Sequence, residues 1–296
     1  MDPFKETLGV MTMVYQDYFF LERWYRYYGA QVGPQNLFIY SHGGDPKHKE
    51  IAPEANVINV PRDPGMVKLE RRRWRMQGYA ASGLLDFYNW MIVGDVDEIV
   101  IVDPSRAEGL RAYLAETFPD KSTAPLNISP LGIEIIHLPE KEPLPLEDQS
   151  TILSRRQHFK VSRSYSKPCL IGQPAIFAPG GHRNNGGPRH LSDDLFLLHL
   201  RFVDFSMLEA RIEKRRAMLD RAQAENAQYE KAHVWDSTMR EYQGFAGLDV
   251  RGEDVTLAAE RAALGKQFER YANQYVPGRA TFDALYKLPD RFKNVF

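Results

Sequence analysis

The chain has 296 residues, 43% of them hydrophobic, which is enough for one large core or two small ones. Its 38 basic and 39 acidic residues nearly balance, which excludes the whole-protein positive field of a nucleic-acid-binding protein. The single cysteine, Cys169, excludes an internal disulfide and fits a reducing compartment. There is no charged-then-apolar leader and no apolar run of about 18 residues. We therefore expect a cytoplasmic protein without a transmembrane segment, for which peripheral membrane association remains open.

Short apolar segments alternate with amphipathic ones through the first third of the chain. Strands are predicted at 9–14, 37–40 and 57–60, and helices after Asp17, over about 67–85, and from a cap near Asp103. This alternation is typical of an α/β fold with a mostly parallel, Rossmann-like sheet and flanking helices.

After Pro119 the pattern changes. Further strand structure is predicted over 122–138 with an interruption at Pro130, and at 171–177 and 195–202, with a loop over 139–149. From Ser206 to about Ala232 the pattern is helical, and the remainder is expected to consist of helical pieces and a tail. These features predict a catalytic domain over 1–205 and a helical C-terminal region over 206–296.

The most informative segment, NWMIVGDVDEIVIVDP at 89–104, places three acidic residues between two apolar runs. Such runs indicate strands buried on both faces. Asp95, Asp97 and Glu98 then need compensation, because an unpaired buried charge is strongly destabilising. A divalent cation is the simplest compensation, since Asp95 and Asp97 would project to the same side of an extended backbone. The alternative is a helix cap or a surface turn.

Four further segments contribute candidate residues. His199 interrupts the apolar run LLHLRF, either as a core histidine or as a metal ligand, a common role of imidazole. Asp193 and Asp194, just upstream, are either a turn pair or the source of a general base for an attacking hydroxyl. Lys167 and Lys68 are candidates to offset phosphate charge.

Together, three segments resemble glycosyltransferases of the GT-A type, in the family 2-like and family 92-like group. They are VYQDYFFLERWYRYYGAQVGPQNLFIYSHGGDP near the N-terminus, NWMIVGDVDEIVI, and LLHLRFVDFSMLEARIEK, and the resemblance covers about 9–214. Two motifs depart from the group's pattern. Tyr15-Gln16-Asp17 stands where Arg-Asn-Glu is usual, and His42-Gly43-Gly44-Asp45 stands where Asp-Asn-Gly-Ser is usual.

The resemblance implies a Rossmann-like domain that binds a nucleotide diphosphate sugar and transfers the sugar, with inversion, to a hydroxyl of a saccharide or another acceptor. It implies Mn²⁺ or Mg²⁺ bound by Asp97 and His199, with Asp95 contacting the ribose or a metal-bound water. Asp17 and Asp45 would lie near the nucleoside. Asp194 or Asp193 would be the general base.

Three other classes remain open. A nucleotidyltransferase would also use acidic residues and Mg²⁺, but it usually has a Gly-rich basic phosphate loop near its N-terminus, and this chain has none. A phosphatase with a DxD nucleophile would carry that motif after its first strand, whereas here it follows about the fourth. A non-catalytic carbohydrate- or nucleotide-binding protein would tolerate loss of the acidic triplet.

Overall fold

The computed structural model describes residues 1–62, 68–147, 150–213, 233–253 and 255–296. The chain forms two compact units, each built from three stretches. Unit 1 comprises Met1–Ile133, Ser162–Leu198 and Thr256–Thr281, and unit 2 comprises Glu134–Val161, His199–Val255 and Phe282–Phe296. These are structural units, and the functional division at residue 205 stays a prediction.

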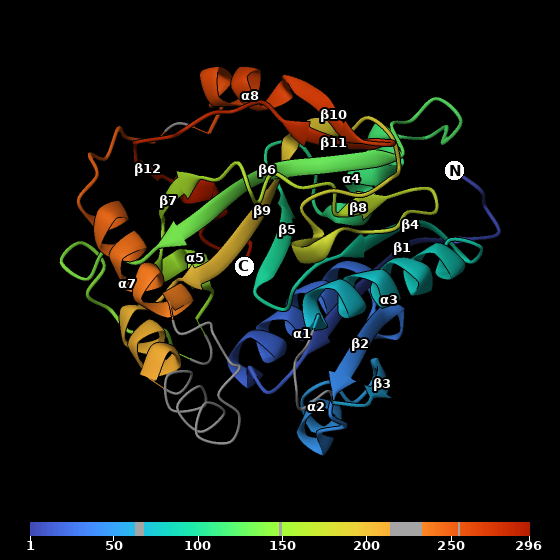
Figure 1. Cartoon of the computed structure of the whole chain (residues 1–296), viewed down its shortest axis with the longest axis horizontal. Coiled ribbons are helices and arrows are strands. Elements are labelled where there is room, and N and C mark those ends of the chain that lie inside the picture. The colour runs from blue at the N-terminus through green and yellow to red at the C-terminus, as the bar shows by residue number, and fades with distance from the viewer. Residues whose placement is uncertain (63–67, 148–149, 214–232, 254) are drawn as a thin grey trace. The chain divides into compact units, whose positions relative to one another are not determined.

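Unit 1 is built around four parallel strands in the order β3-β2-β1-β4 (Figure 1). Antiparallel β8 continues the sheet next to β4 and pairs with β6 as well, while β5 pairs with β9. The strands are β1 (Glu6–Val14), β2 (Leu37–His42), β3 (Asn56–Val60), β4 (Tyr88–Val93), β5 (Glu98–Val102), β6 (Asn127–Ile136), β8 (Leu170–Ile171) and β9 (His190–Phe202). Strands β6 and β9 continue into unit 2. The predicted α/β class is confirmed.

Helices follow the strands of unit 1 and cover both faces of the sheet. They are α1 (Tyr18–Val32), η1 (Pro34–Asn36), α2 (Pro46–Ile51), α3 (Leu69–Leu84) and α4 (Leu110–Thr117). Both faces of β1 are buried, as its apolar sequence predicts. Met11 and Met13 belong to the cluster that contains Trp74 of α3. The alternate residues Val10 and Val14 point to the other face.

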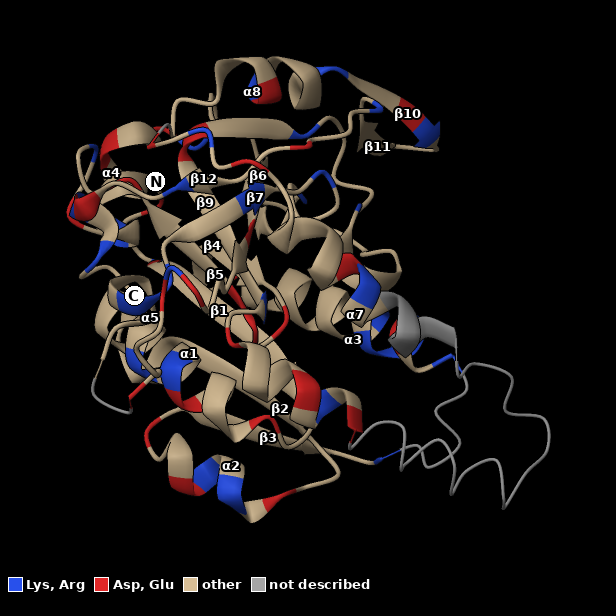
Figure 2. Cartoon of the chain, turned by 90° about the vertical axis from the view of Figure 1, so that its left-hand side faces the viewer, with Lys and Arg blue, Asp and Glu red and all other residues tan. Residues whose placement is uncertain are grey.

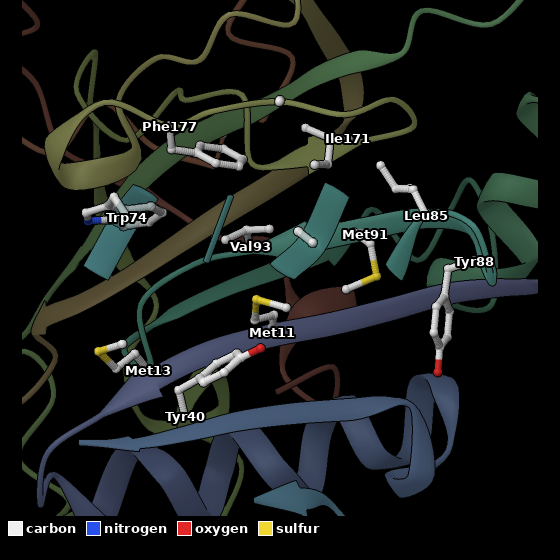
Figure 3. Packing of buried hydrophobic residues seen from close by; sticks show 12 residues of the cluster. Met11, Met13, Tyr40, Trp74, Leu85, Tyr88, Met91, Val93, Ile171 and Phe177 are labelled. Atoms are coloured by element: carbon white, nitrogen blue, oxygen red, sulfur yellow. The ribbon is translucent and has the colours of Figure 1, made fainter. Parts of the chain in front are cut away.

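The core beneath α3 is made of large apolar side chains from helix and sheet (Figure 3). Trp74 and Leu85 pack with Met11, Met91 and Val93, all less than 6% exposed. Burying side chains of this size contributes about 1.5–3 kcal/mol each. This packing fixes α3 over β1 and β4, and so fixes the position of the charged residues at the start of the helix.

The structure differs in three details from what the sequence predicts. Helix α4 begins at Leu110, because the Asp103 carboxylate accepts hydrogen bonds from Ser105 and closes a local turn there. Pro130 lies inside a continuous β6, since the φ angle of proline is compatible with extended backbone. The C-terminal region is only partly helical.

Strands accompany the helices in that C-terminal region. Unit 1 includes α8 (Ala258–Gly265), β10 (Gln267–Tyr271) and β11 (Gln274–Pro277), and the two strands form an antiparallel hairpin. Unit 2 includes α5 (Ile152–Arg155), β7 (His158–Val161), α7 (His233–Ala246) and β12 (Tyr286–Lys287), with β7 antiparallel to β12. The two remaining 3-10 turns are η2 (Pro179–Gly181) and η3 (Asp290–Phe292). Most of the helix predicted over 206–232 lies outside the described residues.

Candidate functional site

The carboxyl ends of the parallel strands in unit 1 bring together four predicted site residues. Asp17 follows β1, Asp45 follows β2, and Asp95 and Asp97 follow β4. The chain passes from β1 outward to β2 and β3, and β4 then lies on the opposite side of β1. Open α/β sheets bind ligands outside the carboxyl ends of their strands at such a reversal of strand order. We therefore take this edge as the candidate site.

The acidic triplet forms a tight turn between β4 and β5. The Glu98 amide donates to the Asp95 carbonyl at 3.0 Å, and the Asp95 amide donates to Glu98 Oε2 at 3.1 Å. The expectation that Asp95 and Asp97 project to the same side of an extended backbone is therefore wrong, because β4 ends at Val93 and β5 begins at Glu98. The turn leaves Asp95 and Asp97 half-buried and Glu98 buried.

A lysine compensates the most buried carboxylate of this turn. Lys167 Nζ lies 2.7 Å from Glu98 Oε1, and both side chains are at most 2% exposed. The same ammonium donates to the Gly180 carbonyl at 3.0 Å and lies 4.8 Å from the centre of the Trp74 ring. Lys167, predicted as a phosphate contact, is thus part of a buried ion pair that supports the acidic turn.

Asp95 is paired in turn with Arg73 from α3. The two Nη atoms of Arg73 lie 2.5 and 3.2 Å from the two oxygens of Asp95, a bidentate arrangement. Glu70 accepts from the same guanidinium at 2.9 and 3.0 Å. Burial alone would lower the pKa of Arg73, but Asp95 and Glu70 raise it above its ordinary value. Two carboxylates of the triplet are therefore compensated by protein cations, which the sequence argument did not consider.

The backbone after β1 adopts an unusual conformation. Gln16 and Asp17 have φ angles of 58° and 41°, in the left-handed region that non-glycine residues rarely occupy. Each residue held in this conformation destabilises the fold by about 1–3 kcal/mol, and such residues concentrate at functional sites. Asp17 precedes α1, as predicted, but its side chain makes no capping hydrogen bond. Side-chain caps usually need extended backbone at that residue.

Asp45 joins the starts of two helices at the end of β2. Its Oδ1 accepts from the Lys47 amide at 3.0 Å and caps α2, and its Oδ2 accepts from the Tyr18 hydroxyl at 2.6 Å. The hydrogen bond from Tyr18 is the main reason that the pKa of Asp45 is lowered and that of Tyr18 is raised. Gly43 and Gly44, with φ angles of 97° and 67°, make the turn before it possible.

Replacing Tyr18 by Phe is expected to raise the pKa of Asp45 toward its ordinary value. Asp45 has a lowered pKa in the folded protein, so it contributes stability above its unfolded pKa and loses that contribution as the pH falls through the folded pKa. The variant should therefore protonate at higher pH. A pH titration of the Asp45 carboxyl carbon by NMR measures this shift, and superimposable titration curves for the two proteins would contradict it.

An aromatic and cationic group borders the same edge. The Arg62 guanidinium lies 3.7 Å from the centre of the Tyr15 ring, and the Tyr15 and His42 rings meet edge to face at 6.0 Å. Arg62, Tyr18 and Arg73 were not among the candidate residues predicted from the sequence. Arginine runs in helices are usually solvated, and only the tertiary contacts distinguish Arg73 from its neighbours.

The structure does not bring Asp193 and Asp194 to this edge. Both lie inside β9, and the Asp194 carbonyl accepts from the Asp103 amide at 2.9 Å. Asp103 follows the far end of β5, whereas Glu98 begins it. Four residue steps of about 3.3 Å put roughly 13 Å of strand between the two ends. The Asp194 carboxylate lies 3.6 Å from Arg106 Nε instead.

The remaining predicted residues are His199 and Lys68. His199 belongs to unit 2, where its Nδ1 lies 3.6 Å from Glu134 Oε1 and both side chains are buried. Burial raises the pKa of the nearby Glu241, and Glu134 adds to that effect. Lys68 is exposed and directly precedes α3. Among the residues that the structure describes, no group of three or more His, Cys, Asp or Glu side chains is arranged to hold a metal ion.

Comparison with known proteins adds little. No protein-family model and no curated protein matches the chain. Among solved structures, mannose-1-phosphate geranyltransferase from Thermus thermophilus is similar over 57% of this chain and 51% of its own, with 13% sequence identity and a TM-score of 0.25. The chain thus matches about half of that protein's length. A similarity of this strength carries no inference about function.

Among the described helices, none is both long and apolar enough to cross a membrane.

Proposed function

We propose that the protein transfers a sugar from a nucleotide diphosphate sugar to a hydroxyl acceptor. The observation that carries this proposal is the acidic turn at 95–98, which stands at the carboxyl end of β4 beside β1, where the strand order reverses. The turn is held from two sides by Arg73 and Lys167. Rigid support of this kind is what a site needs to position a charged donor.

The nucleoside would lie at the ends of β1 and β2. The Tyr15 ring, 37% exposed, lies there next to the buried His42, and Arg62 adds positive charge over the Tyr15 ring. Asp45, ionised and held by Tyr18, can accept hydrogen bonds from sugar or base groups. Asp17 lies at the strained corner after β1. Asp17 and Asp45, two of the residues predicted from the family resemblance, follow the neighbouring strands β1 and β2.

Asp97 is the residue we propose to hold Mn²⁺ or Mg²⁺. Its half-buried carboxylate supplies the hard oxygen that these ions prefer. Mg²⁺ usually takes one or two carboxylates together with substrate phosphates and water, so a cage of several protein ligands is not required. When bound, such an ion offsets charge that develops on the leaving diphosphate. Asp95, fixed by Arg73, would contact the ribose or a metal-bound water.

Thermal denaturation tests this assignment. A nucleotide that binds only with the ion should stabilise the fold by about 2.7 kcal/mol at a hundredfold excess over its dissociation constant. We therefore expect UDP or GDP to raise the melting temperature with Mn²⁺ present and to leave it unchanged without the metal. Equal shifts in both conditions, or no shift with any nucleotide, would refute the proposal.

Product analysis separates this proposal from its two rivals. A glycosyltransferase releases nucleotide diphosphate from the donor, whereas a nucleotidyltransferase would release pyrophosphate from a nucleoside triphosphate and a sugar phosphate. A binding protein without activity would show the thermal shift and release neither product.

A further inference from the structure

The outer face of α3 carries a row of exposed cationic side chains. Arg71, Arg75 and Tyr79 are spaced by four residues and are neighbours on the helix surface, and Lys68 and Arg72 adjoin them. All five are exposed. The opposite side of the helix is buried and includes Trp74, Gln77, Gly78 and Ala81. The basic row is therefore the solvent face of a helix whose other face is fixed in the core.

This face differs from the rest of a nearly neutral chain. Figure 2 shows acidic and basic segments scattered over several helices and loops, and α2 carries both signs, with Lys47, Lys49 and Glu50. On α3, Glu70 is paired with Arg73 and Asp95 shares that guanidinium. Within the described ranges, neither Arg71 nor Arg75 forms an ion pair. Like charges four residues apart on a helix are destabilising, and cations near a helix N-terminus are disfavoured as well.

Exposed aromatic side chains lie on α3 and close to its C-terminal end. Tyr79 is 58% exposed, and Phe87, just beyond the helix, is 68% exposed. Phe4, 97% exposed, shortly precedes β1, whose first residue, Glu6, donates its amide to the Phe87 carbonyl at 2.9 Å. The helix is about 24 Å long, with Arg71 and Arg75 in its first two turns and Tyr79 about one turn beyond Arg75.

We propose that this face of α3 docks on an anionic lipid bilayer. Lipid headgroups provide negative charge for Arg71 and Arg75, and each basic residue near such a surface contributes to binding. Tyrosine and phenylalanine insert at the interface between headgroups and acyl chains. A soluble polyanion would account for the arginines but not for the exposed rings. The inference does not depend on the proposed enzymatic function.

Vesicle sedimentation tests the proposal with the full chain. We expect the protein to sediment with vesicles of equal parts phosphatidylcholine and phosphatidylglycerol, to remain in solution with pure phosphatidylcholine, and to be released by salt. The double variant Arg71→Gln/Arg75→Gln should lose affinity by about 5-fold for each arginine, on the order of 25-fold together. Its melting temperature should be unchanged, because both side chains are exposed.

A matched control removes the same charge elsewhere in unit 1. Arg111 and Lys266 are also exposed, and Arg111→Gln/Lys266→Gln should bind the anionic vesicles as the wild type does. Tyr79→Ser should weaken binding without altering its dependence on salt. Equal losses in the two double variants would overturn the proposal, as would absence of sedimentation with anionic vesicles. Binding to dextran sulfate without binding to vesicles would assign the face to a soluble polyanion and would also overturn it.

Discussion

Asp97→Asn is expected to abolish the metal-dependent part of nucleotide binding. The amide has nearly the same shape as the carboxylate but lacks the negative charge that a hard divalent cation requires. The stabilisation of about 2.7 kcal/mol expected at a hundredfold excess of nucleotide over its dissociation constant should therefore disappear. Melting temperatures with nucleotide, recorded with and without Mn²⁺, measure the loss. A metal-dependent shift equal to that of the wild type would exclude Asp97 as the main ligand.

Asp193→Asn is the matched control for this experiment. It makes the same chemical change at an exposed aspartate of unit 1 that the structure places away from the acidic turn. Its metal-dependent shift should equal that of the wild type. His199→Ala tests the second predicted metal ligand. Loss of a supporting metal-site residue typically weakens metal binding by about 10- to 100-fold, a smaller effect than the loss expected for Asp97→Asn. Unchanged metal affinity in a folded His199→Ala protein would make His199 a core residue.

The parallel sheet was predictable because its signal is local. The sequences of buried strands such as β1 and β4 are continuous apolar runs, and apolar residues recur at helical spacing in the helices between them. The hairpin over 267–277 was not predicted. Its first strand, QFERY, is mostly exposed and lacks the alternation of apolar and polar residues that marks a half-buried strand.

The acidic segment stands out in the sequence, but the compensation of its charges does not. Three acids between two apolar runs mark a candidate site within a single segment. Their partners come from elsewhere: Arg73 lies 22 residues from Asp95, and Lys167 lies 69 residues from Glu98. No periodicity connects residues so far apart. The inference from buried carboxylates to a metal ion therefore needed the tertiary structure, because a lysine or an arginine can offset the same charge.

Lys167→Met is expected to destabilise the fold by about 3–5 kcal/mol, because it leaves the Glu98 carboxylate buried without its cation. The surface pair Lys287–Glu253 is a matched control, since its atoms are also 2.7 Å apart but its side chains are 34% and 49% exposed. Lys287→Met should lower the free energy of unfolding by less than about 1 kcal/mol. Urea denaturation of the three proteins measures the difference, and equal losses would contradict the role of burial.

The double variant Lys167→Met/Glu98→Gln separates loss of the ion pair from loss of packing. Replacing both charges removes the uncompensated carboxylate, while the side-chain carbonyl of the introduced glutamine can still accept the Asp95 amide. The double variant should therefore regain most of the stability that Lys167→Met loses. A double variant no more stable than Lys167→Met would show that the contacts of the ammonium with the Gly180 carbonyl and the Trp74 ring matter more than its pairing with Glu98. Recovery of stability without recovery of nucleotide binding would instead show that the charged pair positions the acidic turn.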